Sequence, residues 1–315
     1  MKKIVVAPDS FKGSLTSAEV ADAVERGIKD VFPQCNVVKA GVADGGEGTV
    51  EAIVKAVGGD MYAASVTDPL GRPVKAAYGI VRSGGVKTAV MEMSAASGLP
   101  LLLPDELNPW ITSTYGTGEM ISDALNRGCR KFLVGIGGSA TNDAGTGMLS
   151  ALGVRFLDNS GQRLKGCGRD LESIARIDMS SLMPAARESE FIVACDVNTP
   201  FCGPDGAARV FAPQKGADPQ TAEALDRGMR SFARVIAGQF QTDIVPLSGA
   251  GAAGGLGGAF KAFLNARLTA GIEMVLDAIA FDSLLEGADL VITGEGRIDA
   301  QTAAGKTAAG VLRHS

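Results

Sequence analysis

The sequence predicts an α/β protein in which helices cover a parallel sheet and an antiparallel element interrupts it. Short β-branched runs alternate with segments of helical periodicity, and polar, glycine-containing loops follow several of the apolar runs. One early stretch changes instead to alternating residues broken by turn sequences. The chain has 315 residues and is 46% hydrophobic, so it can bury a large core, and its length fits two domains better than one.

The first elements follow the order strand, helix, strand, helix. A β-branched run at 2–7 precedes a loop, and residues 16–19 have the S/T-x-x-E form of a capping box. Apolar residues then recur at helical spacing, which predicts a helix over 17–32. A second strand is expected at 36–43, and a second helix extends to about residue 58.

The antiparallel element is predicted between about residues 60 and 103. Here DPLGRP at 68–73 and SGG at 83–85 are typical of hairpin turns. Helices and strands then alternate again. The helices are expected near 112–127, 144–152 and 219–238, and the strands at 131–137, 190–196 and 288–294.

Composition excludes several classes of function. The formal net charge is −5 without a basic block, so we expect no nucleic-acid partner. No stretch reaches the roughly 18 apolar residues of a membrane span, and the first apolar run is too short for a signal peptide. The five cysteines lack a CxxC pair, which predicts buried thiols in a cytoplasmic protein. The single histidine, His314, excludes histidine-based triads, so proton transfer falls to Asp, Glu or Lys.

Five polar loops are expected at the carboxyl ends of strands, where open α/β sheets bind ligands. They are PDSFKGS at 8–14, ADGGEGT at 43–49, GIGGSATNDAG at 135–145, DVNTP at 196–200 and TGEGRID at 293–299. Each combines small residues, which let backbone N–H groups approach an anion, with polar or charged side chains. Together they favour phosphoryl transfer, which needs a cationic clamp and carboxylates.

The candidate side chains divide by charge. The candidate cations are Lys12, Lys215, Arg297 and Lys306, and the candidate carboxylates are Asp9, Asp44, Glu47, Asp143, Asp196, Glu295 and Asp299. Any one of them has an ordinary alternative, because a lone loop cation is usually solvated and a lone Asp often caps a helix.

Two further glycine motifs support other interpretations. AAGKT at 303–307 ends like a P-loop, but Ala300 stands where that motif needs its first glycine. GAGAAG at 249–254 matches the dinucleotide fingerprint, yet Pro246 interrupts the apolar run before it. We therefore favour a glycine-rich helix start near a phosphate or substrate, and an NAD-linked oxidoreductase remains the alternative.

The motifs taken in order closely resemble those of the bacterial glycerate kinase family, from residue 7 to about 306. They are APDSFKGSL, ADGGEGT, GIGGSATNDAG, DVNTPFCG, FAPQKGA, GAAGGLGG and TGEGRIDAQTAAGK. The resemblance implies ATP and Mg²⁺ as cofactors, D-glycerate as substrate and 2-phosphoglycerate as product, in glycerate, glyoxylate or sugar-acid breakdown. It also implies the glycerate kinase type I fold, a flavodoxin-like parallel-sheet domain with a second α/β domain inserted.

The resemblance places the domain boundaries at 1–61 plus 286–315 for the flavodoxin-like domain and 62–285 for the inserted domain. Chains of the family continue beyond the TGEGRID segment, so we expect this one to be shortened at its C-terminus and to leave a sheet edge exposed. A D-glycerate 3-kinase and a truncated, binding-only homologue are the alternatives. The sequence leaves open whether the protein is a monomer or a homo-oligomer.

Loop position and the matched motifs together predict the site residues. Catalytic roles are expected for Asp196, Lys12 and Asp44, with Asp196 orienting the substrate hydroxyl, and metal binding for Asp44 and Glu295. Substrate or nucleotide contacts are expected for Asp9, Ser10, Gly45, Gly46, Glu47, Gly137, Gly138, Ser139, Thr141, Asn142, Asp143, Asn198, Lys215, Gly254, Gly255, Arg297, Asp299 and Lys306.

Overall fold

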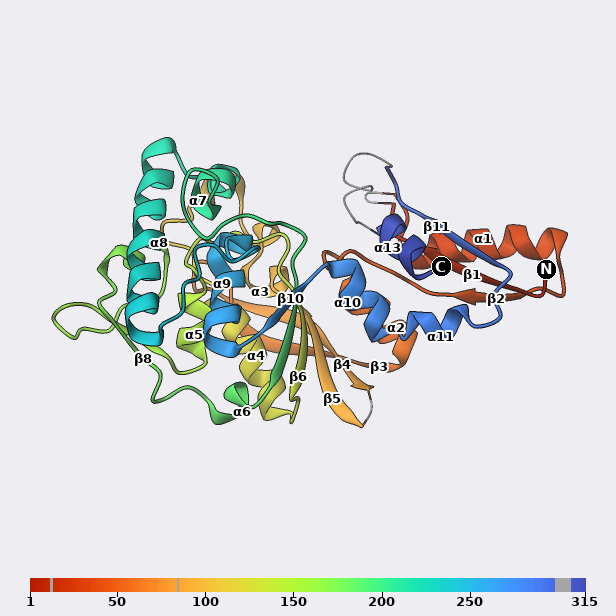
Figure 1. Cartoon of the computed structure of the whole chain (residues 1–315), viewed down its shortest axis with the longest axis horizontal. Helices are drawn as coiled ribbons and strands as arrows, with labels where there is room; N and C mark the ends of the chain where they lie inside the picture. Colours follow the sequence, from red (N-terminus) through yellow and green to blue (C-terminus); the bar gives the residue numbers. More distant parts are fainter. Residues whose placement is uncertain (12–13, 84, 298–306) are drawn as a thin grey trace.

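The computed structural model describes residues 1–11, 14–83, 85–297 and 307–315. Across these residues the strands form a three-stranded sheet, a six-stranded sheet and a two-stranded ribbon (Figure 1). Most pairings in the two larger sheets are parallel, so the predicted α/β class is confirmed.

The three-stranded sheet combines strands from the N-terminal and C-terminal parts of the chain. Its order is β11 (Leu290–Gly294), β1 (Lys3–Pro8), β2 (Asn36–Lys39), and both pairings are parallel. The strand predicted at 36–43 therefore ends early, at Lys39. Between β1 and β2 runs α1 (Ser17–Val31), which begins with both hydrogen bonds of the predicted capping box.

Successive side chains of β1 point to opposite faces of this sheet, and both faces are covered. Ile4 and Val6 pack with Ala21 of α1. Val5 and Ala7 point the other way and belong to a larger apolar cluster. A parallel sheet needs cover on both faces, and the β-branched run of β1 provides apolar residues for each.

The six-stranded sheet is mixed. Its order is β10 (Arg267–Thr269), β9 (Glu190–Ala194), β6 (Lys131–Gly135), β5 (Val86–Glu92), β4 (Pro73–Ser83), β3 (Gly59–Thr67). The hairpins predicted at 68–73 and 83–85 join β3, β4 and β5 as antiparallel neighbours. Because β5 also pairs in parallel with β6, the antiparallel element extends the parallel sheet and does not stand outside it. The predicted strand at 190–196 ends at Ala194.

Helices pack on both faces of the six-stranded sheet, and α13 packs against β1 and β11 of the three-stranded sheet. The helices after α1 are α2 (Thr49–Val57), α3 (Ser94–Ser97), α4 (Tyr115–Asn126), α5 (Thr146–Ala151), α6 (Pro184–Arg187), α7 (Ala207–Phe211), α8 (Pro219–Phe240), α9 (Ala252–Leu264), α10 (Gly271–Ala278), α11 (Phe281–Leu285) and α13 (Thr307–His314). The two-stranded ribbon pairs β7 (Arg155–Leu157) with β8 (Arg176–Asp178). Among the described helices, none combines the length and apolar character needed to cross a membrane.

One apolar cluster joins the two sheets. It contains Val5 of β1, Ile192 of β9 and Val275 of α10. In Figure 1, α2 and α10 lie where the two sheet regions meet. The boundary predicted between residues 61 and 62 falls inside β3, which begins at Gly59, and the division into domains stays a prediction.

Candidate functional site

Parallel strands of both sheets have their carboxyl ends at loop 43–49, which follows β2. A Cβ on Gly45 would lie 2.5 Å from the Cβ of Ala194, at the end of β9, and the φ of Gly45 is +82°. A Cβ on Gly135, at the end of β6, would overlap the carbonyl oxygen of Gly45. Glycine is therefore required at both positions for this close backbone approach.

Two of the predicted catalytic residues, Asp196 through its carboxylate and Asp44 through its backbone, meet at Gly271, the first residue of α10. The backbone N–H of Gly271 donates to Asp196 Oδ1 at 2.9 Å, and a Cβ on Gly271 would overlap the carbonyl oxygen of Asp44. Asp196 is exposed, and Asp44 Oδ1 accepts a hydrogen bond from the N–H of Gly46 at 3.2 Å. The helix N-terminus carries partial positive charge, which attracts a nearby carboxylate.

A second pair of predicted residues lies at the ends of β1 and β11. Asp9 and Glu295 each follow the paired residues Pro8 and Gly294 directly. Asp9 is 6% exposed, and its carboxylate accepts hydrogen bonds from the N–H of Ser10 and the hydroxyl of Thr307, both at 2.6 Å. The buried Oε1 of Glu295 has no hydrogen-bond partner in the part of the chain that the structure describes.

A cavity of ≈ 740 Å³ opens between α1 and α2 beside these loops. The predicted residues Asp9, Ser10 and Glu47 line it, together with Glu92 at the end of β5 and the basic side chain of Lys55. Its volume is in the range of small-molecule sites, and both signs of charge lie on its walls.

Glu92 is a site residue that the sequence motifs did not reveal. It lies between the buried Met91 and Met93, and its Oε1 accepts from the N–H of Val50 in the first turn of α2 at 3.2 Å. Burial raises the pKa of the Glu92 carboxyl to about 7, although the Val50 hydrogen bond lowers it. An acid between two apolar residues at a strand end was the signal that could have identified it.

Other predicted residues lie inside the six-stranded region. Lys215 is 1% exposed, and its Nζ donates to Ser139 Oγ and to the carbonyl oxygen of Thr141, both at 2.7 Å. Burial lowers the pKa of Lys215 to about 7, and the nearby charge of Asp143 opposes this shift. Lys215 thus holds the segment that follows the exposed Gly137 and Gly138 of the same loop.

Asp143 is fully buried and holds the same loop from within. Its carboxylate accepts from the N–H and hydroxyl of Thr114 and from the N–H groups of Gly145 and Gly147. Burial raises the pKa of Asp143, and these hydrogen bonds lower it. A Cβ on Gly254 would overlap the carbonyl oxygen of Thr141.

The interior residues therefore have packing contacts that the loop motifs did not indicate. The buried ones are Ser139, Thr141, Asn142, Asp143, Lys215, Gly254 and Gly255. Asn198 is exposed and accepts from the hydroxyl of Ser248, and Arg297 is also exposed. Lys12, Asp299 and Lys306 lie outside the described residues. Ligand contacts by all of these residues stay predictions.

The GAGAAG segment does not have the context of a dinucleotide site. The residues from Gln241 to Ala250 contain no strand, and α9 begins at Ala252 with left-handed residues from Ala253 to Gly255. A dinucleotide fingerprint follows a strand directly, so the oxidoreductase alternative is not supported.

Parallel strands of both sheets end beside an acid- and lysine-lined cavity, an arrangement typical of α/β proteins that bind small charged ligands. A family model described as the glycerate kinase family matches residues 4–315. The Bacillus subtilis glycerate kinase is 50% identical over 311 residues, 99% of this chain and 81% of the relative. The Escherichia coli K12 glycerate 2-kinase is 47% identical over 309 residues, 98% of this chain and 81% of the relative.

A crystal structure from Salmonella typhimurium LT2, described as a glycerate kinase 2, has the same fold. Its TM-score is 0.94 at 48% identity, covering 99% of this chain and 83% of that one. The chain belongs to the glycerate kinase family and is a kinase.

Proposed function

We propose that this chain transfers the γ-phosphoryl group of ATP to the 2-hydroxyl of D-glycerate, giving ADP and 2-phosphoglycerate. The observation that carries the proposal is the family match over residues 4–315. The name of the Escherichia coli relative, glycerate 2-kinase, supports the 2-hydroxyl as the acceptor.

Within this reaction we assign Asp196 to orient the glycerate hydroxyl. We assign Asp44 to bind the metal ion at the phosphates. The exposed position of Asp196 and its link to Asp44 through Gly271 support this assignment. Lys12 would supply positive charge from the loop between β1 and α1. Phosphoryl transfer depends on positioning and charge stabilisation, and these residue types supply both.

Glu92 is a second candidate for the group that accepts the hydroxyl proton. It lines the cavity, and its pKa of about 7 lies near the pH at which a general base is most effective. It ends a strand of the six-stranded sheet, whereas Asp9, which also lines the cavity, follows β1 of the three-stranded sheet.

Magnesium fits the donor set at this edge of the sheets. Mg²⁺ is commonly held by one or two carboxylates together with substrate phosphates. Glu295 Oε1 is buried without a hydrogen-bond partner among the described residues, and a bound cation would satisfy it. Asp44 and Glu295 would hold the ion, which neutralises phosphate charge when bound.

We also propose that the protein acts in the cytoplasm. All five cysteines are free thiols, which supports a reducing compartment.

The proposal is tested by a coupled assay of ADP release, with phosphorus NMR of the product. Magnesium-dependent ADP release that requires D-glycerate, with 2-phosphoglycerate as product, is expected. Product phosphorylated at the 3-hydroxyl would reject the acceptor position. Nucleotide binding without ADP release would reject turnover.

The same assay tests the residue roles. Asp196→Asn is expected to lower kcat/KM by about 10²-fold or more, because a hydroxyl-orienting carboxylate acts in the transition state. Asp205→Asn, at an exposed aspartate on another loop, is the matched control and should leave kcat/KM unchanged. Wild-type turnover in both Asp196→Asn and Asp44→Asn at saturating magnesium would contradict the assignment. If only Glu92→Gln loses turnover, Glu92 and not Asp196 is the residue that orients the glycerate hydroxyl and accepts its proton.

A further inference from the structure

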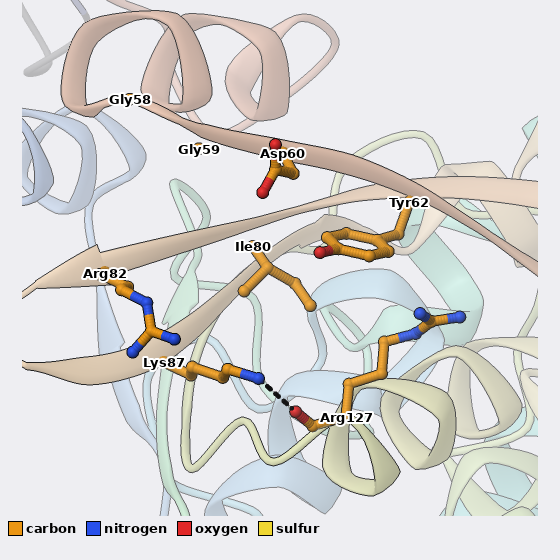
Figure 2. Close-up of a pocket in the computed structure, with 8 residues that line it drawn as sticks. All are labelled: Gly58, Gly59, Asp60, Tyr62, Ile80, Arg82, Lys87 and Arg127. Atoms are coloured by element: carbon orange, nitrogen blue, oxygen red, sulfur yellow. Dashed lines mark hydrogen bonds between the residues drawn. The ribbon is translucent and has the colours of Figure 1, made fainter.

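A second pocket, of ≈ 480 Å³, lies away from the cavity beside α1. It is lined by Gly58, Gly59, Asp60, Tyr62, Ile80, Arg82, Lys87 and Arg127. Lys87 is near the start of β5, and Glu92 ends the same strand at the first cavity, so the two sites lie at opposite ends of β5. Figure 2 shows Arg82 and Lys87 at the left of the pocket, Asp60 above, Ile80 in the centre, and Tyr62 with Arg127 at the right.

Two like charges face each other on one wall of this pocket. Arg82 of β4 and Lys87 of β5 are directly opposite residues in the antiparallel register. Such a pair destabilises a sheet because the side chains of opposite residues lie close together on one face. Within the described residues, Arg82 is exposed and no hydrogen bond or ion pair holds its guanidinium.

The other polar groups leave this positive charge available. Arg127 pairs with Asp123 at 2.8 Å and lies 4.8 Å from the centre of the Tyr62 ring, so it is committed within the protein. Lys87 Nζ donates to the carbonyl oxygen of Arg127 at 2.9 Å, which uses one of its three donors. That bond satisfies the C-terminal end of α4, but it does not involve Arg82.

We propose that this pocket binds the phosphate group of a small metabolite through Arg82 and Lys87. The planar guanidinium of arginine matches phosphate oxygens in a bidentate manner, and the lysine adds a point charge. A bound phosphate dianion would attract both side chains and so offset the repulsion between them. Asp60 would accept a hydrogen bond from a hydroxyl group of the ligand, and Ile80 and Tyr62 would contact its carbon atoms.

Two backbone amides that line the pocket can report ligand binding directly. Gly58 and Gly59 form the link between α2 and β3, and both line the pocket. At its other end, α2 begins directly after Gly48 of loop 43–49. The site is independent of the proposed reaction, because none of its lining residues belongs to the first cavity.

The test is an amide NMR titration of the full chain with inorganic phosphate and, separately, with glycerol 3-phosphate. The amides of Gly58 and Gly59 report this pocket, and those of Gly45 and Gly46 report the sheet ends near the first cavity. We expect saturable shifts at Gly58 and Gly59. Arg82→Gln and Lys87→Gln should each raise that Kd about tenfold or more, because each removes a charge-assisted hydrogen bond.

Lys75→Gln is the matched control, since Lys75 is an exposed cation of β4 outside the pocket. It should leave the Kd unchanged. Shifts confined to Gly45 and Gly46, or the same Kd in Arg82→Gln and Lys75→Gln, would overturn the proposal. Tighter binding of glycerol 3-phosphate would show that the pocket contacts the organic part, whereas equal affinities would assign it to the phosphate ion itself.

Thermal unfolding gives a second readout that does not depend on NMR assignments. Phosphate should raise the Tm of the wild type and of Lys75→Gln, because a ligand that binds the folded state stabilises it. It should not raise the Tm of the Arg82→Gln, Lys87→Gln double variant. An equal rise in the double variant would count against the site.

Discussion

Glu92 shows how a single side chain can acquire a property that its residue type does not have in water. The carboxyl lies at the end of β5 and is removed from solvent, and the acidic Glu51 and Glu47 nearby raise its pKa further. The N–H of Val50 opposes these effects but does not cancel them. The neutral form is therefore favoured in the folded protein up to a pH of about 7.

This environment predicts a pH dependence of stability. The folded pKa of about 7 lies above the ordinary value of 4.5, so the folded protein holds this proton more tightly than the unfolded chain. The contribution of Glu92 is therefore fully present below pH 4.5 and is lost as the pH rises through about 7. Glu92→Gln keeps the hydrogen-bond acceptor for α2 but cannot ionise. Relative to the wild type, it should gain on the order of 2 kcal/mol of unfolding free energy between pH 5 and pH 8.

Urea unfolding at the two pH values measures this difference directly. Carboxylates that do not interact with Glu92 titrate equally in both proteins, so they cancel in the comparison. A Glu92→Gln variant whose stability relative to the wild type is the same at pH 5 and pH 8 would show that Glu92 is not held in a strongly desolvating environment.

Loop 43–49 shows why glycine occurs where it does at the scale of an element. Gly45 and Gly48 both have positive φ, of +82° and +88°. Only Gly45 is packed against another strand end, because a Cβ on Gly48 would meet nothing within 4 Å. Gly48 therefore has only an unfavourable backbone conformation for other residues, whereas Gly45 has that conformation and also leaves no room for a Cβ.

The two glycines give a matched pair of variants. Gly48→Ala should cost about 1–2 kcal/mol, the price of a left-handed conformation for a residue with a Cβ. Gly45→Ala should cost about 1–3 kcal/mol more, because its Cβ would also collide with Ala194. Urea unfolding measures both changes, and activity assays should show a larger loss for Gly45→Ala. Equal costs would mean that the loop moves away from β9 without penalty.

At the scale of the whole molecule, the two sheets share one apolar cluster. Val5 of β1, Leu133 of β6 and Val275 of α10 all belong to it. The far face of the six-stranded sheet has its own cluster, which includes Leu171 and Phe232. The shared cluster should make the two sheets unfold as one cooperative unit, although proteins with two domains often unfold in separate steps.

Leu171→Ala tests this cooperativity, because Leu171 is fully buried on the far side of the large sheet. It should lower stability by about 2–5 kcal/mol. Hydrogen exchange should then show an equal loss of protection for the amides of Ile192 in β9 and Val5 in β1. If protection in β1 is unchanged, the three-stranded sheet unfolds independently.

The sequence by itself determined the local features of this protein. The capping box at Thr16 and Glu19, the hairpin turns and the alternation of strands with helices depend on residues close in the chain, and local propensity and periodicity specify them. The loops after β1, β2, β6, β9 and β11 were predicted for the same reason. Strand ends were less accurate, because where pairing stops depends on the neighbouring strand.

Tertiary structure alone decided how the predicted loops are used. Gly271 contacts the backbone at Asp44 across more than two hundred residues of chain, and Lys215 reaches Ser139 from a distant segment. The same long-range packing surrounds Glu92 with apolar and acidic groups and gives it a shifted pKa. Burial and close backbone approach depend on which distant segments meet, and no local pattern in the sequence encodes that information.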